Sequence, residues 1–282
     1  MFRLTTKKKL ATILMIDLNT LKNKKHKNYI QYSTFTNKEG RLIYNPSKEL
    51  KIIQGRLFKY LSRIETPDYL KSGKKGLSYL DNAKAHINNH NCIVTADISG
   101  FYKNCKRKHV YKMFIEKFEM GKDIAGIITD FVCYENFIPT GSSTSQLTAY
   151  FTYSKAFDFI NQIANNKNFT FTLYVDDITF SSNNTINRSI IYEVNCRLLQ
   201  QGLKLKTSKT NFYHKNEACI ITGSAIDKFG NLRVLNKHRK SIIESYIEYR
   251  KFPENEKNKI KIKGKLQSAR MIEKNIFPTF KI

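Results

Sequence analysis

Two neighbouring carboxylates, Asp176 and Asp177, lie in the middle of an apolar stretch rich in β-formers, residues 171–180. The residue types on both sides predict a strand, a tight turn and a second strand. Two like charges at the tip of a buried strand pair are costly unless a cation neutralises them, and carboxylate oxygens are ligands that Mg²⁺ prefers. An Asp-Asp pair also occurs in ordinary turns, so this stretch alone does not identify a metal site.

A third carboxylate, Asp97, lies near the end of another predicted strand, residues 92–98. Two strand ends that carry acids indicate a two-metal centre for phosphoryl transfer, in which the cations lie about 4 Å apart. One cation activates the attacking oxygen and the other holds the leaving pyrophosphate. We expect Asp97 and Asp176 to bridge both ions, Asp177 to be an auxiliary ligand, and the backbone carbonyl of Ile98 to add a further ligand.

The charge of the chain indicates its class of partner. Its 282 residues include 49 Lys and Arg against 23 Asp and Glu, a formal net charge of +26. This excess favours a polyanion as partner. A membrane surface is the alternative polyanion, but no apolar run has the length of a spanning helix, and the basic residues are spread along the whole chain. Nucleic acid is therefore the expected partner, with no membrane association.

The cysteines favour a reducing compartment. The five cysteines show no paired spacing, and residues 1–21 lack the pattern of a secretory signal. Reduced thiols in the cytoplasm are therefore expected. His86, His90 and Cys92 are zinc-type side chains, but no second pair of ligands lies nearby, so we do not expect zinc there.

The periodicity of apolar residues predicts an α+β chain built around an antiparallel sheet, with helices on one face. Helices are expected in residues 1–30, 48–63, 77–90, 110–118, 122–132, 147–163, 190–198 and 237–282. Strands are expected at 29–36 and 41–44 as a hairpin, at 92–98, at 169–182 as a pair, and at 203–206, 219–226 and 232–235. This order places both acid sites on one sheet.

With these residues in place, the chain resembles reverse transcriptases. Tyr174-Val175-Asp176-Asp177 is similar to their catalytic box, and the run from Asp97 to Tyr102 is similar to their first carboxylate box. Residues 139–146 resemble the loop that backs the incoming nucleotide, and residues 205–210 resemble the downstream lysine box. Any one block is unspecific, but their common order makes coincidence improbable.

Two further blocks resemble those of bacterial retron reverse transcriptases. Residues 82–86 match an Asn-Ala-x-x-His block, and residues 221–223 match a Val-Thr-Gly block with Ile in first place. The resemblance runs from about residue 29 to 235. The chain departs from the family where Thr140 replaces a common Gln and Gln146 replaces a common Pro, which leaves the details of nucleotide contact open.

The resemblance implies a right-hand polymerase fold with fingers, palm and a short helical thumb. Fingers and palm are expected in residues 1–236 and a basic thumb in residues 237–282. The implied activity is RNA-directed DNA polymerisation by Asp97, Asp176 and Asp177 with two Mg²⁺ ions. The thumb is expected to follow the duplex backbone without reading its sequence.

The resemblance also implies a set of nucleotide-binding residues, namely Lys38, Arg41, Tyr102, Gly141 and Lys209. Tyr102 falls at the steric-gate position, where its ring would exclude a ribose 2′-hydroxyl; the alternative is a core aromatic. Lys38 and Arg41 would grip the triphosphate. A solvated hairpin tip for Lys38 and a plain surface position for Lys209 are the other interpretations. Gly141 would let the backbone approach the nucleotide.

Contacts to primer and template are expected from a second group, comprising Asn82, His86, Thr222, Gly223, Lys237, Arg239, Lys240, Tyr246 and Arg250. Asn82 and His86 lie one helical turn apart, so they would either contact RNA or brace the first acid strand. Tyr246 would stack on bases of an RNA loop. The basic thumb either selects the RNA or is a generic phosphate clamp.

The function implied by the retron resemblance is copying part of the system's own structured non-coding RNA into branched multicopy single-stranded DNA. Partners would be this RNA, its DNA product, dNTPs and a separate effector protein in defence against phage. Alternatives are a group II intron-like or diversity-generating reverse transcriptase, an RNA-binding scaffold with a polymerase-like fold, and a two-metal nuclease. The intact Asp97, Asp176 and Asp177 disfavour the scaffold, and Tyr102 disfavours the nuclease.

Overall fold

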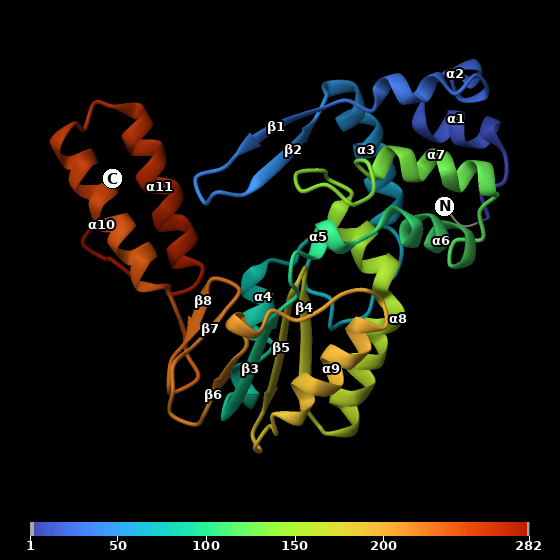
Figure 1. Ribbon diagram of the computed structural model, residues 1–282. Helices are drawn as coiled ribbons and strands as arrows, with labels where there is room; N and C mark the ends of the chain where they lie inside the picture. Colours follow the sequence, from blue (N-terminus) through green and yellow to red (C-terminus); the bar gives the residue numbers. More distant parts are fainter. Residues whose placement is uncertain (1–2, 281) are drawn as a thin grey trace.

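The computed structural model describes residues 3–280 and Ile282, and a four-stranded antiparallel sheet lies at its centre (Figure 1). The strand order is β4-β5-β3-β6. Their bounds are β3, Cys92–Asp97; β4, Thr170–Tyr174; β5, Asp177–Ser182; and β6, Asn211–Tyr213. The strand expected at 203–206 is wrong, because this segment only crosses the end of β3, with the Ser99 N–H donating to the Lys204 carbonyl at 2.8 Å. β6 follows it and was not expected.

The two faces of this sheet differ in chemistry, as strand alternation requires. One face carries apolar side chains such as Val94 and Phe180, and it packs in the main core with α8 (Ser145–Asn166) and α9 (Ser189–Leu199). The other face carries Thr95, Thr179, Ser181 and the acids, following the register of β3 with β5. On this polar face lie α4 (Tyr79–Lys84) and the short 3₁₀ turn η2 (Ile87–Asn89).

A helical layer and a protruding hairpin lie above the sheet (Figure 1). The hairpin consists of β1 (Tyr32–Thr36) and β2 (Leu42–Pro46), as expected. The helices of this layer are α1 (Lys7–Leu14), α2 (Leu18–Lys22), η1 (Lys25–Tyr29), α3 (Lys48–Leu61), α5 (Phe101–Asn104), α6 (Arg107–Glu116) and α7 (Lys122–Val132). The expected N-terminal helix is broken at Met15, whose φ is 49°, and Asp17 caps the next helix by accepting from the Thr20 N–H.

A three-stranded sheet joins the centre to the C-terminal part. Its strands are β7 (Cys219–Ile221), β8 (Ser224–Ile226) and β9 (Leu232–Arg233). The single strand expected over 219–226 is wrong, because Thr222 and Gly223 fold it into a two-residue turn with φ values of 43° and 89°. Positive φ at both central residues is the backbone of the hairpin turns that match strand twist.

The last two helices form an antiparallel pair that we call the C-terminal hairpin (Figure 1). It consists of α10 (Asn236–Lys251) and α11 (Glu256–Arg270). It has a small core of its own, which includes Ile242, Ile262 and Leu266 and is separate from the main core. Among the described residues, no helix combines the length and the apolar composition that crossing a bilayer requires.

Candidate active site

The three acids of the sequence analysis meet at one end of the central sheet. Asp97 pairs with Asp177 in the register of β3 and β5, and the Ile98 N–H donates to the Asp176 carbonyl at 3.0 Å. Asp176 lies in the tight turn between β4 and β5, which also contains Val175. The backbone pairing therefore fixes the spacing of the three carboxylates, and the alternation of the strands places Asp97 and Asp177 on the same polar face.

The turn that carries Asp176 is strained. Val175 has a φ of 59°, a conformation that is rare for a β-branched residue. Its N–H donates to the Ser72 hydroxyl at 2.9 Å, which ties the turn to a loop 103 residues away. Ser72 was not among the expected site residues, because only its contact across the fold connects it to the acids.

The electrostatics of this end of the sheet favour a cation. Burial, followed by the charges of Asp176 and Asp97, raises the pKa of Asp177 to about 7. Burial and the Asp97 charge also raise the pKa of Asp176. Lys209 Nζ donates to Asp97 Oδ2 at 2.6 Å, and this hydrogen bond raises the pKa of Lys209. One lysine thus pairs with one carboxylate, while the other two remain under mutual repulsion.

This donor set fits Mg²⁺ by its chemistry, because all of its side-chain donors are hard carboxylate oxygens. No three His, Cys, Asp or Glu side chains among the described residues form a preformed metal cage, and Asp97 is engaged with Lys209. Burial and like charges raise the pKa values of Asp176 and Asp177 and so disfavour their ionised forms, and a divalent cation would offset this.

A cavity of about 250 Å³ opens beside these acids. The structure brings together several expected site residues here, from the central sheet, from the turn η3 (Thr207–Lys209) and from the β7–β8 turn. Its lining consists of Thr95, Ala96, Asp97, Asp177, Thr179, Lys209, Asn211, Ile220, Thr222 and Gly223. Ile220 and Asn211 were not expected, and nothing in their local sequence indicates the cavity.

Tyr102 lies close to the acids, in the short helix α5. Its side chain is half-buried against the main core and its ring lies 5.7 Å from that of Phe101. Burial, followed by the charge of Asp176, raises the pKa of the Tyr102 phenol. The ring is therefore partly a core residue and partly a neighbour of the carboxylates, so both earlier interpretations describe part of its environment.

Gly141 has a structural reason that the sequence analysis did not anticipate. Its φ is 103°, and a Cβ at this position would lie 2.8 Å from the Tyr44 carbonyl oxygen. Thr140 secures this contact, since its carbonyl accepts from the Tyr44 N–H at 3.0 Å and its hydroxyl donates to Leu42. The close approach that needs glycine is thus to strand β2.

The tip of the β1–β2 hairpin carries Lys38 and Arg41, both exposed. Asn37 Oδ1 accepts from the N–H groups of Glu39 and Arg41, which orders the tip. Arg41 is near enough to the acids for its charge to oppose the raised pKa values of Asp176 and Asp177, whereas no such effect of Lys38 is resolved. Arg41 therefore contributes positive charge at the acids, while its Nε lies 3.7 Å from Glu39 Oε2 on the hairpin tip.

Asn82 and His86 are fully buried, which contradicts direct contact with RNA. Asn82 Nδ2 donates to the Thr222 hydroxyl at 3.2 Å, and this hydroxyl in turn donates to the Tyr79 carbonyl. Both ring nitrogens of His86 have hydroxyl partners: Nδ1 lies 2.7 Å from Ser181 Oγ, and Nε2 lies 2.8 Å from Thr172 Oγ1. The bracing alternative describes them better, although His86 braces β4 and β5 rather than the first acid strand.

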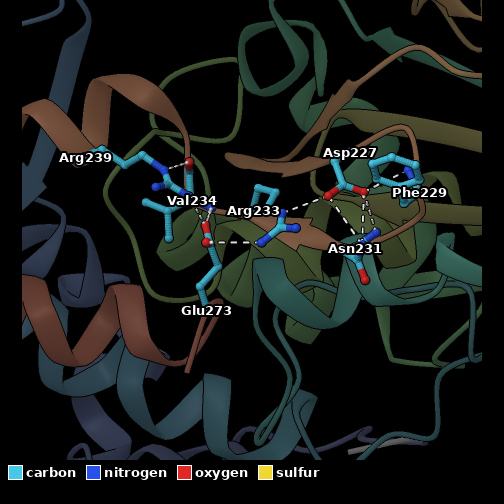
Figure 2. A network of polar contacts seen from close by, with 7 residues as sticks. All are labelled: Asp227, Phe229, Asn231, Arg233, Val234, Arg239 and Glu273. Atoms are coloured by element: carbon cyan, nitrogen blue, oxygen red, sulfur yellow. Dashed lines mark hydrogen bonds and ion pairs between the residues drawn. The ribbon is translucent and has the colours of Figure 1, made fainter. Parts of the chain in front are cut away.

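Two residues of α10 that were expected to contact nucleic acid have partners in the segments that flank the C-terminal hairpin. Arg239 donates to Glu273 Oε1 at 2.6 Å and to the Val234 carbonyl at 3.1 Å (Figure 2). The ring of Tyr246 stacks on Phe280 with 3.8 Å between centroids. These partners contradict a free guanidinium and a free stacking face. The remaining basic side chains of that group are exposed, namely Lys237, Lys240 and Arg250.

Comparison with known proteins supports the sequence resemblance. The chain is 26% identical over 232 residues to the retron Se72 reverse transcriptase of Salmonella heidelberg, which covers 78% of this chain and 59% of that protein. It is 26% identical over 196 residues to the retron Ec86 reverse transcriptase of Escherichia coli, covering 68% of this chain and 60% of that protein. The chain thus spans less than two thirds of the length of these relatives.

Solved structures are similar in fold. Apo telomerase from Candida tropicalis, truncated from its C-terminal domain, matches 73% of this chain and 54% of that chain, with a TM-score of 0.53 and 10% identity. Telomerase from Candida albicans matches 78% of this chain and 50% of that chain, with a TM-score of 0.51 and 12% identity. The expected right-hand polymerase fold is confirmed. Residues 22–261 match the family model described as reverse transcriptase (RNA-dependent DNA polymerase), and the chain belongs to this family.

Proposed function

We propose that the chain is the RNA-directed DNA polymerase of a retron. The observation that carries this proposal is the meeting of Asp97, Asp176 and Asp177 at one sheet end, beside a cavity and with two of their pKa values raised. The similarity to two retron reverse transcriptases supports the retron type. So does the hydrogen bond between Asn82 and Thr222, which joins the two blocks that resemble retron proteins.

In this proposal, Asp97, Asp176 and Asp177 hold two Mg²⁺ ions, with the Ile98 carbonyl as a further ligand. Bound Mg²⁺ would make the primer hydroxyl a better nucleophile and offset charge on the leaving pyrophosphate. Lys209 holds the Asp97 carboxylate and supplies positive charge at the cavity. A phenol is neutral at physiological pH even without the upward pKa shift of Tyr102, so the side chain offers the incoming sugar a ring without charge.

The remaining parts of the proposal concern the substrates. Arg41 and Lys38 meet the triphosphate of a dNTP from the β1–β2 hairpin, and the β7–β8 turn at Thr222 and Gly223 meets the primer end. Residues 1–236 would be fingers and palm, and residues 237–282 the thumb. Because α10 begins at Asn236, this division falls at a helix start. The thumb would follow the duplex backbone with its exposed cations.

The template and primer are proposed to be one structured non-coding RNA, and the product to be branched multicopy single-stranded DNA. An effector protein and a role against phage complete the proposal and rest on the resemblance, while the proposed cytoplasmic location rests on the unpaired cysteines. The net charge of +26 supports the RNA partner.

The decisive experiment is primer extension with Mg²⁺ and dNTPs on an annealed RNA template. Wild-type protein should extend the primer, whereas Asp97→Asn should not. Asp123→Asn removes an exposed carboxylate from α7 and is the matched control that should extend normally. For the retron type, nucleic acid copurified from a cell that carries a neighbouring structured RNA gene is digested with RNase or DNase. A product that is sensitive to both enzymes supports branched RNA–DNA, and a product sensitive only to RNase argues for an RNA-binding scaffold.

A further inference from the structure

The turn between β8 and β9 holds one of the most exposed aromatic side chains of the described residues. We call residues 227–231 the 227–231 turn. Phe229 at its tip is 72% exposed, although it is a large apolar side chain. Lys228 places its ammonium 5.0 Å from the centre of the Phe229 ring. The tip of the turn therefore presents an apolar ring face and a positive charge side by side.

Hydrogen bonds order the backbone of the turn and hold Phe229 at its tip. The Asp227 carboxylate accepts from the N–H groups of Phe229 and Asn231, both at 2.9 Å, and from Arg233 Nε at 2.8 Å (Figure 2). Arg233 also reaches Glu273, after the C-terminal hairpin, at 3.5 Å. A ring held on such a frame loses little conformational freedom when it binds a partner.

Close packing anchors the same turn to the central sheet. Gly230 has a φ of 83°, and a Cβ there would lie 2.8 Å from His90 Cε1. His90 is held by the Ile87 carbonyl, 2.6 Å from its Nδ1, just before β3 begins. Asp97 ends that strand, so His90, which the turn contacts, lies about 20 Å along the strand from Asp97 at about 3.3 Å per residue. The turn is therefore outside the candidate active site.

The surroundings of the turn suit a nucleic acid. Next to His90, an amide cluster forms from Asn91, which donates to the Asn183 carbonyl, and Asn183, which donates to the Asn88 carbonyl. The acid of the turn itself, Asp227, is neutralised by Arg233. Glu217 is the acid on the neighbouring β6–β7 loop, where it accepts from a backbone N–H. Because these amides and Arg233 already have protein partners, the Lys228 ammonium beside the Phe229 ring is the group of the turn that would meet a phosphate.

We propose that the 227–231 turn is a second RNA contact, in which Phe229 stacks on an unpaired base and Lys228 contacts the adjoining phosphate. This inference rests on the proposed RNA partner. RNA is favoured over a protein partner because the ring is paired with a cation and the whole chain carries +26. Stacking needs an accessible base face, so the contact is to a loop or bulge and not to a continuous duplex.

The test measures binding of the full chain to two RNAs with equal numbers of phosphates, at raised salt. One is a stem–loop with an adenosine-rich loop, and the other is a fully paired duplex. Phe229→Ala should weaken binding to the stem–loop at least about fivefold and leave duplex binding unchanged. Phe229→Trp should retain binding. Tyr192→Ala is the matched control, because Tyr192 is 74% exposed on α9 and should have no effect.

Equal weakening on both RNAs, or no weakening on either, overturns the inference. A change confined to self-association, measured by light scattering, also overturns it and assigns the turn to a protein contact. Thermal unfolding of each variant excludes misfolding. Extension of a short DNA primer on a plain RNA template is measured in parallel and should be unchanged in Phe229→Ala. Failure of extension in wild-type protein would instead refute the proposed function, so the two failures are distinguishable.

Discussion

Acidic residues lie close together at two places in this protein, and their surroundings shift the carboxyl pKa values in opposite directions at the two places. At the candidate active site, burial and like charges raise the pKa of Asp177 to about 7. In the 227–231 turn, burial alone would raise the pKa of Asp227, but the Asn231 N–H and the Arg233 guanidinium outweigh it and lower the pKa to about 2. Glu273, which lies nearby, forms ion pairs with Arg233 and Arg239.

The difference separates structural carboxylates from those proposed to be catalytic. Asp227 and Glu273 are supplied with arginines from their own chain, and their ion pairs fix the base of the C-terminal hairpin. Asp176 and Asp177 lie in a half-buried tip where Lys209 forms its ion pair with Asp97. Carboxylates that have no cationic side chain as partner are the ones that can bind a metal ion from solution.

The largest expected effect comes from exchanging one acid of each group. Asp176→Asn should lower DNA synthesis at least about 1000-fold, because metal ions supply several kcal/mol to phosphoryl transfer. RNA binding should be nearly unchanged, since the distributed cations hold the backbone. Asp227→Asn should keep its synthesis rate. Primer extension and RNA binding of both variants decide it, and synthesis retained in Asp176→Asn would remove the metal assignment.

The next test concerns Tyr102, the aromatic residue beside the acids, and its effect on the choice of sugar. Tyr102→Ala removes the ring that lies beside Asp176, so ribonucleotides should enter the site more easily. The preference for dNTP over rNTP should fall at least about tenfold, as expected when a pocket loses one steric contact. The measurement is the ratio of incorporation efficiencies for a dNTP and its matching rNTP. An unchanged ratio would make Tyr102 a core residue only.

The structural group should respond in stability and not in chemistry. Glu273→Gln removes the charge that two arginines and the Val234 N–H share, and should cost about 1–3 kcal/mol. Glu248→Gln is the matched control, because the Glu248–Lys261 pair is about half exposed and should contribute less than about 1 kcal/mol. Chemical unfolding of both variants gives the comparison. Equal losses of unfolding free energy in the two variants would mean that the burial of Glu273 does not strengthen its ion pairs.

The sequence predicted the candidate active site better than its surroundings, for a local reason. Asp97, Asp176 and Asp177 lie within or beside stretches whose alternation and β-branched residues define the strands themselves. The pairing of those strands then places the acids without further information. The right-hand fold followed from the order of several such blocks, and comparison with known proteins confirms it.

What the sequence could not predict depends on partners far along the chain. Asn82 bonds to Thr222, 140 positions away, and His86 bonds to Ser181, 95 positions away. Both side chains were expected to contact RNA, but they are buried and hold neighbouring elements together instead. Arg239 finds Glu273 34 positions later. Local periodicity contains no information on which distant polar group a side chain will meet. A positive φ at Thr222 likewise has no local signal, because β-branched residues avoid it.

The last test concerns opposite slopes of stability against pH. The pKa of Asp177 is raised in the folded state, so its contribution is full below its ordinary value of 3.8 and is lost as the pH rises through about 7. The pKa of Asp227 is lowered, so its contribution is full above 3.8 and is lost as the pH falls through about 2. Unfolding with EDTA, across this pH range, should show the first slope vanish in Asp177→Asn and the second in Asp227→Asn. Added Mg²⁺ should stabilise wild-type protein at neutral pH more than Asp177→Asn. Parallel curves for all three proteins would mean that the two groups of acids do not differ in the way that their partners indicate.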